Sequence, residues 1–164
     1  MQPYVTSFGI GLVTGMRSMT ACAALTWAAS QGRTRGAAIP GGPVACTLST
    51  GAALAEMAGD KMPFAPDRRI PPSFALRLVI GAVGGWALAG RRASPTTGAL
   101  AGAAGAIAGT LLGRSARGGD NQSPSGLARG LAEDVVAAGL AVAVVSLADA
   151  RSDADLGERL NLGR

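Results

Sequence analysis

Histidine is absent from this sequence, and aromatic and charged residues are scarce. Without histidine, and with two cysteines that form no CxxC pair, the chain lacks the residues that usually hold zinc or haem or build a histidine-based catalytic site. Aromatic residues make up 4% of the chain, which leaves a water-soluble core short of large side chains. Charged residues make up 15%, against about 25% in average soluble domains. The shortage of charge is the first indication of a membrane protein.

Enzyme signatures are also missing from the sequence. It contains no nucleophile elbow, no HExxH motif and no Walker A loop. Ser18 stands beside Arg17, but no general base accompanies it. Cys22 and Cys46 lie in apolar stretches, and we interpret them as small buried hydrophobic residues. We therefore expect no catalytic activity, no cofactor and no metal site.

Small apolar residues, by contrast, are abundant. The chain has 25 glycines, 48% apolar residues and a mean hydropathy of +0.31. In water such a chain would bury little area per residue, whereas in lipid small side chains let helices approach closely. The composition predicts an all-α integral membrane protein, with a transmembrane domain over residues 1–150 and a charged C-terminal tail over residues 151–164. The first basic residue is Arg17, so we interpret the N-terminal stretch as a retained helix and not as a signal peptide.

The net charge of +5 comes almost wholly from arginine, because Lys61 is the only lysine. The arginines fall mostly in short gaps between apolar stretches, a position that suits contact with lipid headgroups. No basic cluster is interleaved with aromatic residues on a polar face, so nucleic acid is not an expected partner. The expected partner is a lipid bilayer.

Five apolar stretches predict about five short, Gly/Ala-rich helices that cross the membrane or enter it and return. They run about Val5 to Ala29, Pro43 to Ala58, Ser73 to Ala89, Thr96 to Leu112 and Leu127 to Ala148. A crossing needs about 20 residues, so the first and fifth stretches are long enough and the other three are marginal. If all five cross, the N-terminus shares a side with the second and fourth loops, and each side carries seven of the 15 Lys and Arg residues. An equal count predicts no orientation.

Pairs of glycines recur at a spacing of four residues, about one helical turn. The pairs are Gly11 and Gly15, Gly81 and Gly85, Gly98 and Gly102, and Gly105 and Gly109. Each pair lies on one helix face and allows close backbone contact between helices, within the chain or between chains. We expect these residues to pack helices, and we expect a homo-oligomer.

Ionisable residues inside the apolar stretches point to a functional site. The set, with one neighbouring hydroxyl, is Arg17, Ser18, Glu56, Asp60, Lys61, Glu133 and Asp134. A charge at the centre of a bilayer costs about 3 kcal/mol on insertion scales, so such groups should pair with each other or face water. Arg17 stands near the middle of its stretch, and its expected partner is one of the four carboxylates. The set either lines a path for an ion or a small solute, or forms a structural network of ion pairs.

An internal echo suggests that the chain contains two units. A glycine-patterned helix with Arg17 precedes a helix with Glu56, and a glycine-patterned helix ending in Arg114 precedes a helix with Glu133 and Asp134. The single stretch between the units would invert the second relative to the first, as in many transporters.

Three runs of the sequence resemble the DUF4126 family of small bacterial membrane proteins. They are GMRSMTA at 15–21, AEMAGDKMPFAPDR at 55–68, and LAEDVVA at 131–137, which is similar to the family's second acidic signature. The resemblance spans about residues 5–148 and implies a multi-pass protein of the bacterial inner membrane, without a substrate or a reaction. The resulting hypothesis is a small channel or transporter for an unknown ion or small solute. The alternative is a structural or assembly protein whose buried charges only fix helix packing.

Overall fold

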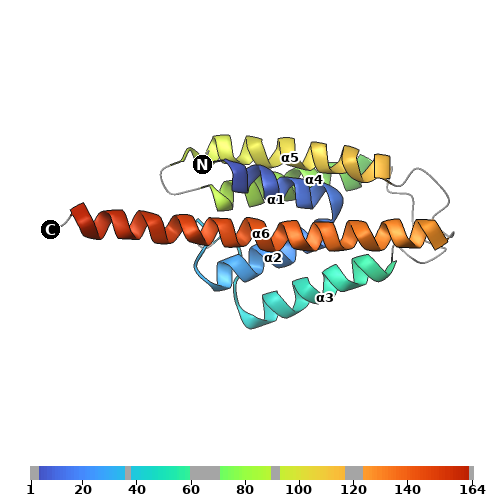
Figure 1. The fold of residues 1–164 in the computed structure, drawn as a ribbon, viewed down its shortest axis with the longest axis horizontal. Coiled ribbons are helices and arrows are strands. Elements are labelled where there is room, and N and C mark those ends of the chain that lie inside the picture. Colours follow the sequence, from blue (N-terminus) through green and yellow to red (C-terminus); the bar gives the residue numbers. More distant parts are fainter. Residues whose placement is uncertain (1–3, 36–37, 60–70, 90–92, 117–123, 163–164) are drawn as a thin grey trace.

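Six α-helices make up the described part of the computed structural model, which covers residues 4–35, 38–59, 71–89, 93–116 and 124–162. Within these residues there is no strand, so the all-helical prediction is confirmed for them. Figure 1 shows the helices side by side, with the last one running along the whole bundle. In chain order they are α1 (Val5–Met16), α2 (Ser18–Ser30), α3 (Pro43–Gly59), α4 (Pro71–Leu88), α5 (Pro95–Ala116) and α6 (Pro124–Leu162).

The first predicted stretch is two helices instead of one. Arg17 has an extended backbone (φ −145°, ψ 100°), which ends α1 and begins α2. α1 begins beside the C-terminal end of α4, where Thr6 Oγ1 donates a hydrogen bond to the Leu88 carbonyl. The chain that follows α2 returns to the same place, where the Arg35 N–H donates to the Ala87 carbonyl. α1 and α2 therefore form a hairpin with Arg17 at its tip.

Successive helices run in opposite directions through the bundle (Figure 1). α3 is antiparallel to α2, because Met19 meets Glu56 while Thr26 meets Ser49. The start of α1 lies at the same end of the bundle as the segment after α2. The expected placement of the N-terminus with the second and fourth loops is therefore wrong, because the hairpin reverses the chain once more than one continuous helix would.

The helix directions also contradict the predicted inversion of the second glycine-patterned helix relative to the first. α1 and α5 run parallel, since Gly11 faces Gly102 and Gly15 faces Ala106. A pair of inverted units would set these two helices antiparallel. The break at Arg17 is the reason, because it adds one helix to the first unit and none to the second.

The remaining predicted stretches agree with α3, α4 and α5 to within a few residues. Proline is the first residue of each of the last four helices. At that position the missing N–H would have had no intrahelical partner, and the fixed φ of proline suits the helix. α6 continues to Leu162, so the charged tail extends the last helix.

All eight paired glycines lie at contacts among α1, α4 and α5. A Cβ at Gly81 would lie 2.8 Å from the Gly102 carbonyl oxygen, and a Cβ at Gly105 would overlap the Phe8 carbonyl oxygen of α1. The same kind of overlap with backbone atoms of a facing helix arises at Gly11, Gly15, Gly85, Gly98, Gly102 and Gly109. α5 thus packs backbone to backbone against both α1 and α4. These contacts lie within one chain, and the homo-oligomer stays a prediction.

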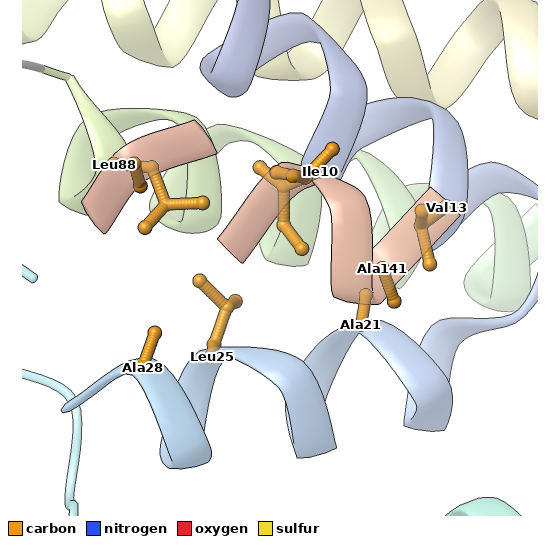
Figure 2. Close-up of a cluster of buried hydrophobic side chains, with 9 residues drawn as sticks. Ile10, Val13, Ala21, Leu25, Ala28, Leu88 and Ala141 are labelled. Atoms are coloured by element: carbon orange, nitrogen blue, oxygen red, sulfur yellow. The ribbon is translucent and has the colours of Figure 1, made fainter. Parts of the chain in front are cut away.

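The buried apolar core is small and lies between α1, α2, α4 and α6. Figure 2 shows Ile10 and Val13 of α1 directed toward Leu25 and Ala21 of α2, with Leu88 of α4 beside them. Most other apolar core positions are alanine, whose short side chain lets the helices lie close together.

The larger apolar side chains point outward instead. Val44 and Leu48 of α3, Leu100 of α5, and Val135 and Val142 of α6 are between 67% and 72% exposed. Among the residues whose burial the structure describes, the buried charged ones are Arg17, Arg77, Glu133 and Asp134, each at most 8% exposed. This part of the bundle therefore exposes large apolar side chains and buries four charged ones beside its small apolar core.

Two helical segments within the described residues are long and apolar enough to cross a membrane. They are Pro95–Gly113 in α5 and Ala128–Ala148 in α6. Val5–Met16 and Pro72–Leu88 are also apolar but are shorter. By length and composition these two segments suggest that the chain associates with a membrane.

Candidate functional site

The hairpin tip brings two helix ends together inside the bundle. α1 ends at Met16 and α2 begins at Ser18. The last carbonyls of α1 and the first N–H groups of α2 have no partners within their own helices, so the break presents a partly negative end and a partly positive end. One side chain from each of the other four helices reaches this tip.

From α6, Asp134 forms an ion pair with Arg17. Both side chains are almost fully buried, at 2% exposure for Arg17 and 8% for Asp134. Of the four carboxylates that were candidate partners for Arg17, Asp134 therefore forms an ion pair with it. Removing one partner of such a pair leaves an uncompensated buried charge, which costs about 3–5 kcal/mol.

From α3, Glu56 takes the place of an N-cap residue for α2. Its Oε2 accepts a hydrogen bond from the Met19 N–H at 3.0 Å. Met19 is the second residue of α2, and its N–H is one of the donors that a helix leaves without an internal partner. The positive end of the helix dipole also stabilises a carboxylate at this position. Glu56 is half-buried, whereas Glu133 and Asp134 are buried.

From α4 and α5, two side chains meet the negative end of α1. Arg77 Nη1 donates a hydrogen bond to the Gly15 carbonyl oxygen at 3.1 Å. Thr110 Oγ1 lies 3.5 Å from the same oxygen. A guanidinium group at a helix C-terminus is stabilised by the dipole, as a carboxylate is at the N-terminus. Each end of the broken helix therefore faces a side chain of the opposite charge.

The structure brings most of the predicted residues to the tip. Ser18 Oγ donates to the Thr14 carbonyl at 3.4 Å, and Glu133 is buried next to Asp134 in the chain. Asp60 and Lys61 lie outside the described residues. The charge cluster that the structure describes consists of Arg17, Arg77, Glu56, Glu133 and Asp134, with two positive groups against three negative ones.

The position of the tip along the bundle follows from helix lengths. At 1.5 Å per residue, Arg77 lies about 9 Å from the start of α4, and Asp134 about 9 Å from Ala128, where the apolar segment of α6 begins. The tip is thus nearer to the starts of α4 and of the apolar segment of α6 than to their ends. The expected position of Arg17 in the middle of one continuous stretch is corrected, because the chain folds back there.

Sequence reasoning missed Arg77 and Thr20 as residues of the site. Arg77 follows the start of an apolar stretch, where an arginine also suits a membrane interface. Only its burial in the structure shows that it contacts the tip instead of such an interface. Thr20 is 6% exposed, and its Oγ1 has no hydrogen-bond partner within the described part of the chain. Nothing in the sequence separates Thr20 from the other threonines of the apolar stretches.

Comparisons with known proteins find no family model, no curated protein and no solved structure that matches this chain. The resemblance to DUF4126 therefore stays a prediction.

Proposed function

We propose that this chain is a multi-pass protein of the bacterial inner membrane that moves an ion or a small solute past the hairpin tip. The observation that carries the proposal is that the described part of the bundle exposes many large apolar side chains and buries four charged ones, a combination that is unusual for a protein folded in water. Only 33% and 39% of the two apolar segments is buried, whereas a core helix of a soluble protein is mostly buried. The bacterial location rests on the resemblance in sequence.

In the proposed topology α3, α4, α5 and α6 cross the bilayer, and the hairpin enters and returns on one side. α1 and α2 have 12 and 13 residues, so each is about 18–20 Å long and too short for a 30 Å layer. α4, with 18 residues, reaches about 27 Å. A re-entrant hairpin among four crossings accounts for these lengths.

The broken helix supports the transport part of the proposal. Non-helical backbone at membrane depth occurs where protein covers it or where it lines a water-filled cavity. The ends of half-helices inside a membrane are also where many transporters bind their ions. At this tip, movement of α3 would uncover the positive end of α2.

A structural role is the second candidate, and the pairing at the tip favours it. Arg17 is paired with Asp134, Glu56 with the Met19 N–H, and Arg77 with the Gly15 carbonyl. In a structural protein these contacts would serve only to fix the order and register of the helices.

Cell fractionation tests the membrane part. We expect the protein to sediment with membranes and to remain there after a carbonate wash, because its exterior is apolar. Recovery of folded protein from buffer without detergent would contradict the proposal.

Flux into proteoliposomes separates transport from a structural role. We expect vesicles with wild-type protein to pass at least one of a panel of cations, anions and small neutral solutes. Asp134→Asn should abolish this flux, because it removes the partner of Arg17 at the tip. Arg129→Gln, at an exposed position on the same helix, should retain it. A folded wild-type protein that passes none of the solutes would favour the structural role.

A further inference from the structure

Three kinds of ligand suit the end of a broken helix, and the tip discriminates among them. An anion would bind at the positive end of α2, but Glu56 already lies there and carboxylates outnumber guanidinium groups in the charge cluster. A metal cation would bind at the carbonyls that end α1, but the Arg77 guanidinium occupies the Gly15 carbonyl. The described residues also contain no group of three or more side chains that could hold a metal ion. A proton on a carboxylate is the remaining ligand.

We propose that the ion is the proton and that Glu56 takes it up, an inference that rests on the proposed transport function. Glu56 is the one half-exposed carboxylate of the charge cluster, whereas Asp134 is buried against Arg17. Glu56 is also the only charged residue of α3, which packs mainly against α2. The groups of α2 that face it are the Met19 N–H and the thiol of Cys22, which is near enough to interact with its charge.

Thr20 provides an independent observation that points to the same ligand. A buried hydroxyl group normally has a hydrogen-bond partner, and that of Thr20 has none in the described structure. Thr20 is the third residue of α2, and side chains in a helix tilt toward its N-terminus, which here is the hairpin tip. Thr20 lies in the same first turn of α2 as the Met19 N–H that Glu56 contacts, and we expect its hydroxyl to accept a hydrogen bond from a protonated Glu56, directly or through one water molecule.

The proposed step is the uptake and release of one proton by Glu56. The Glu56 carboxylate takes one proton from water on one side and becomes a neutral carboxylic acid, and it later releases that proton to the other side. While it is neutral, its hydrogen bond to the Met19 N–H loses its charge assistance and its attraction to the helix dipole. α3 is then held less firmly at the tip, which lets the carboxyl group turn toward Thr20.

Proton flux into proteoliposomes tests the proposal, with a potassium diffusion potential as the driving force and a pH-sensitive dye inside the vesicles. We expect wild-type protein to acidify the vesicles. Glu56→Gln should reduce acidification to the level of empty vesicles, because glutamine cannot take up the proton. Glu158→Gln is the matched control, since Glu158 lies about 36 Å along α6 from Asp134. Thr20→Val keeps the side-chain shape but removes the hydroxyl, and should also lose the flux while Thr20→Ser retains it.

Infrared titration gives a second readout that needs no transport. Acidification protonates every carboxylate of the chain. We therefore expect the carboxylic acid absorption of folded Glu56→Gln to lack one band that the wild type and Glu158→Gln both show. Proton flux at the wild-type level in Glu56→Gln or in Thr20→Val would overturn the proposal. A sodium flux through the wild-type protein that does not depend on pH would also overturn it. If wild-type vesicles pass no ion at all, the transport function fails, and the missing band in Glu56→Gln then decides separately whether Glu56 binds a proton.

Discussion

Two halves of the bundle are held together in different ways. α1, α4 and α5 meet backbone to backbone through glycines, so that a single added methyl group at Gly102 would overlap the facing helix. α2 and α3 meet through side chains instead, with Thr26 Oγ1 2.7 Å from Ser49 Oγ and Trp27 Nε1 3.2 Å from Thr50 Oγ1. In Figure 1, α3 lies at the edge of the bundle, beside α2.

The difference indicates which half can move. Backbone contacts leave no side-chain rotamers to rearrange, so α1, α4 and α5 have one close-packed arrangement. Hydrogen bonds between side chains contribute only about 1 kcal/mol each and can exchange partners. Arg17 lies where the two halves meet, since it ends α1 and begins α2, and Glu56 holds α3 to the first turn of α2 beside it. The tip therefore joins a closely packed half to a weakly held one.

Removal of Arg17 should disrupt the junction most. We expect Arg17→Ala to lower the free energy of unfolding in detergent by about 4 kcal/mol, because it leaves Asp134 buried without its counter-charge. Asp134→Asn should restore part of this loss in the Arg17→Ala background, with a coupling of about 2 kcal/mol in a double-mutant cycle. Arg129→Ala, at an exposed position, is the control. Strict additivity of the two substitutions would show that the pair is not an energetic unit.

A methyl group in the glycine contact should have the next largest effect. We expect Gly102→Ala to lower the free energy of unfolding by about 3 kcal/mol, because its Cβ would overlap the Gly81 carbonyl oxygen of α4. Gly139→Ala is a matched control on α6, where nothing lies within 4 Å of the added atom. There alanine should be neutral or stabilise by up to about 1 kcal/mol, through its higher helix propensity. Equal effects at the two sites would argue against close packing of α5.

The smallest effect is expected in the polar half. Ser49→Ala removes one side-chain hydrogen bond to Thr26, and we expect a loss of about 1 kcal/mol. Hydrogen exchange should show the same contrast without any substitution, with the amides of α3 exchanging faster than those of α5. Slower exchange in α3 than in α5 would reverse the assignment of the two halves.

The glycine pairs illustrate how far the sequence alone predicts contacts. A spacing of four residues predicts that Gly81 and Gly85 share a helix face, and that Gly98 and Gly102 do the same. The structure adds that these two faces meet each other, and that Gly105 meets α1 instead. Spacing within one helix describes its own surface and carries no information about the partner.

The charged residues at the tip show the same limit of prediction from sequence. A charge in an apolar stretch predicts a buried partner for Arg17, and four carboxylates were candidates. The pairing of Asp134 with Arg17 depends on where α6 passes the tip. The roles of Glu56 and Arg77 depend on the break itself, because a continuous helix would offer no free N–H at Met19 and no free carbonyl at Gly15.

By itself the sequence determined a helical chain with small residues where helices meet and few charges, because side-chain size, hydropathy and proline position act within a few residues of chain. Only the tertiary structure decided that the first stretch folds back at Arg17. No proline or glycine stands at that position to end a helix. The break is stabilised by Asp134, Glu56 and Arg77, which come from three other helices. Contacts between residues so far apart in the chain form only once the helices have packed, and for that reason no local pattern encodes them.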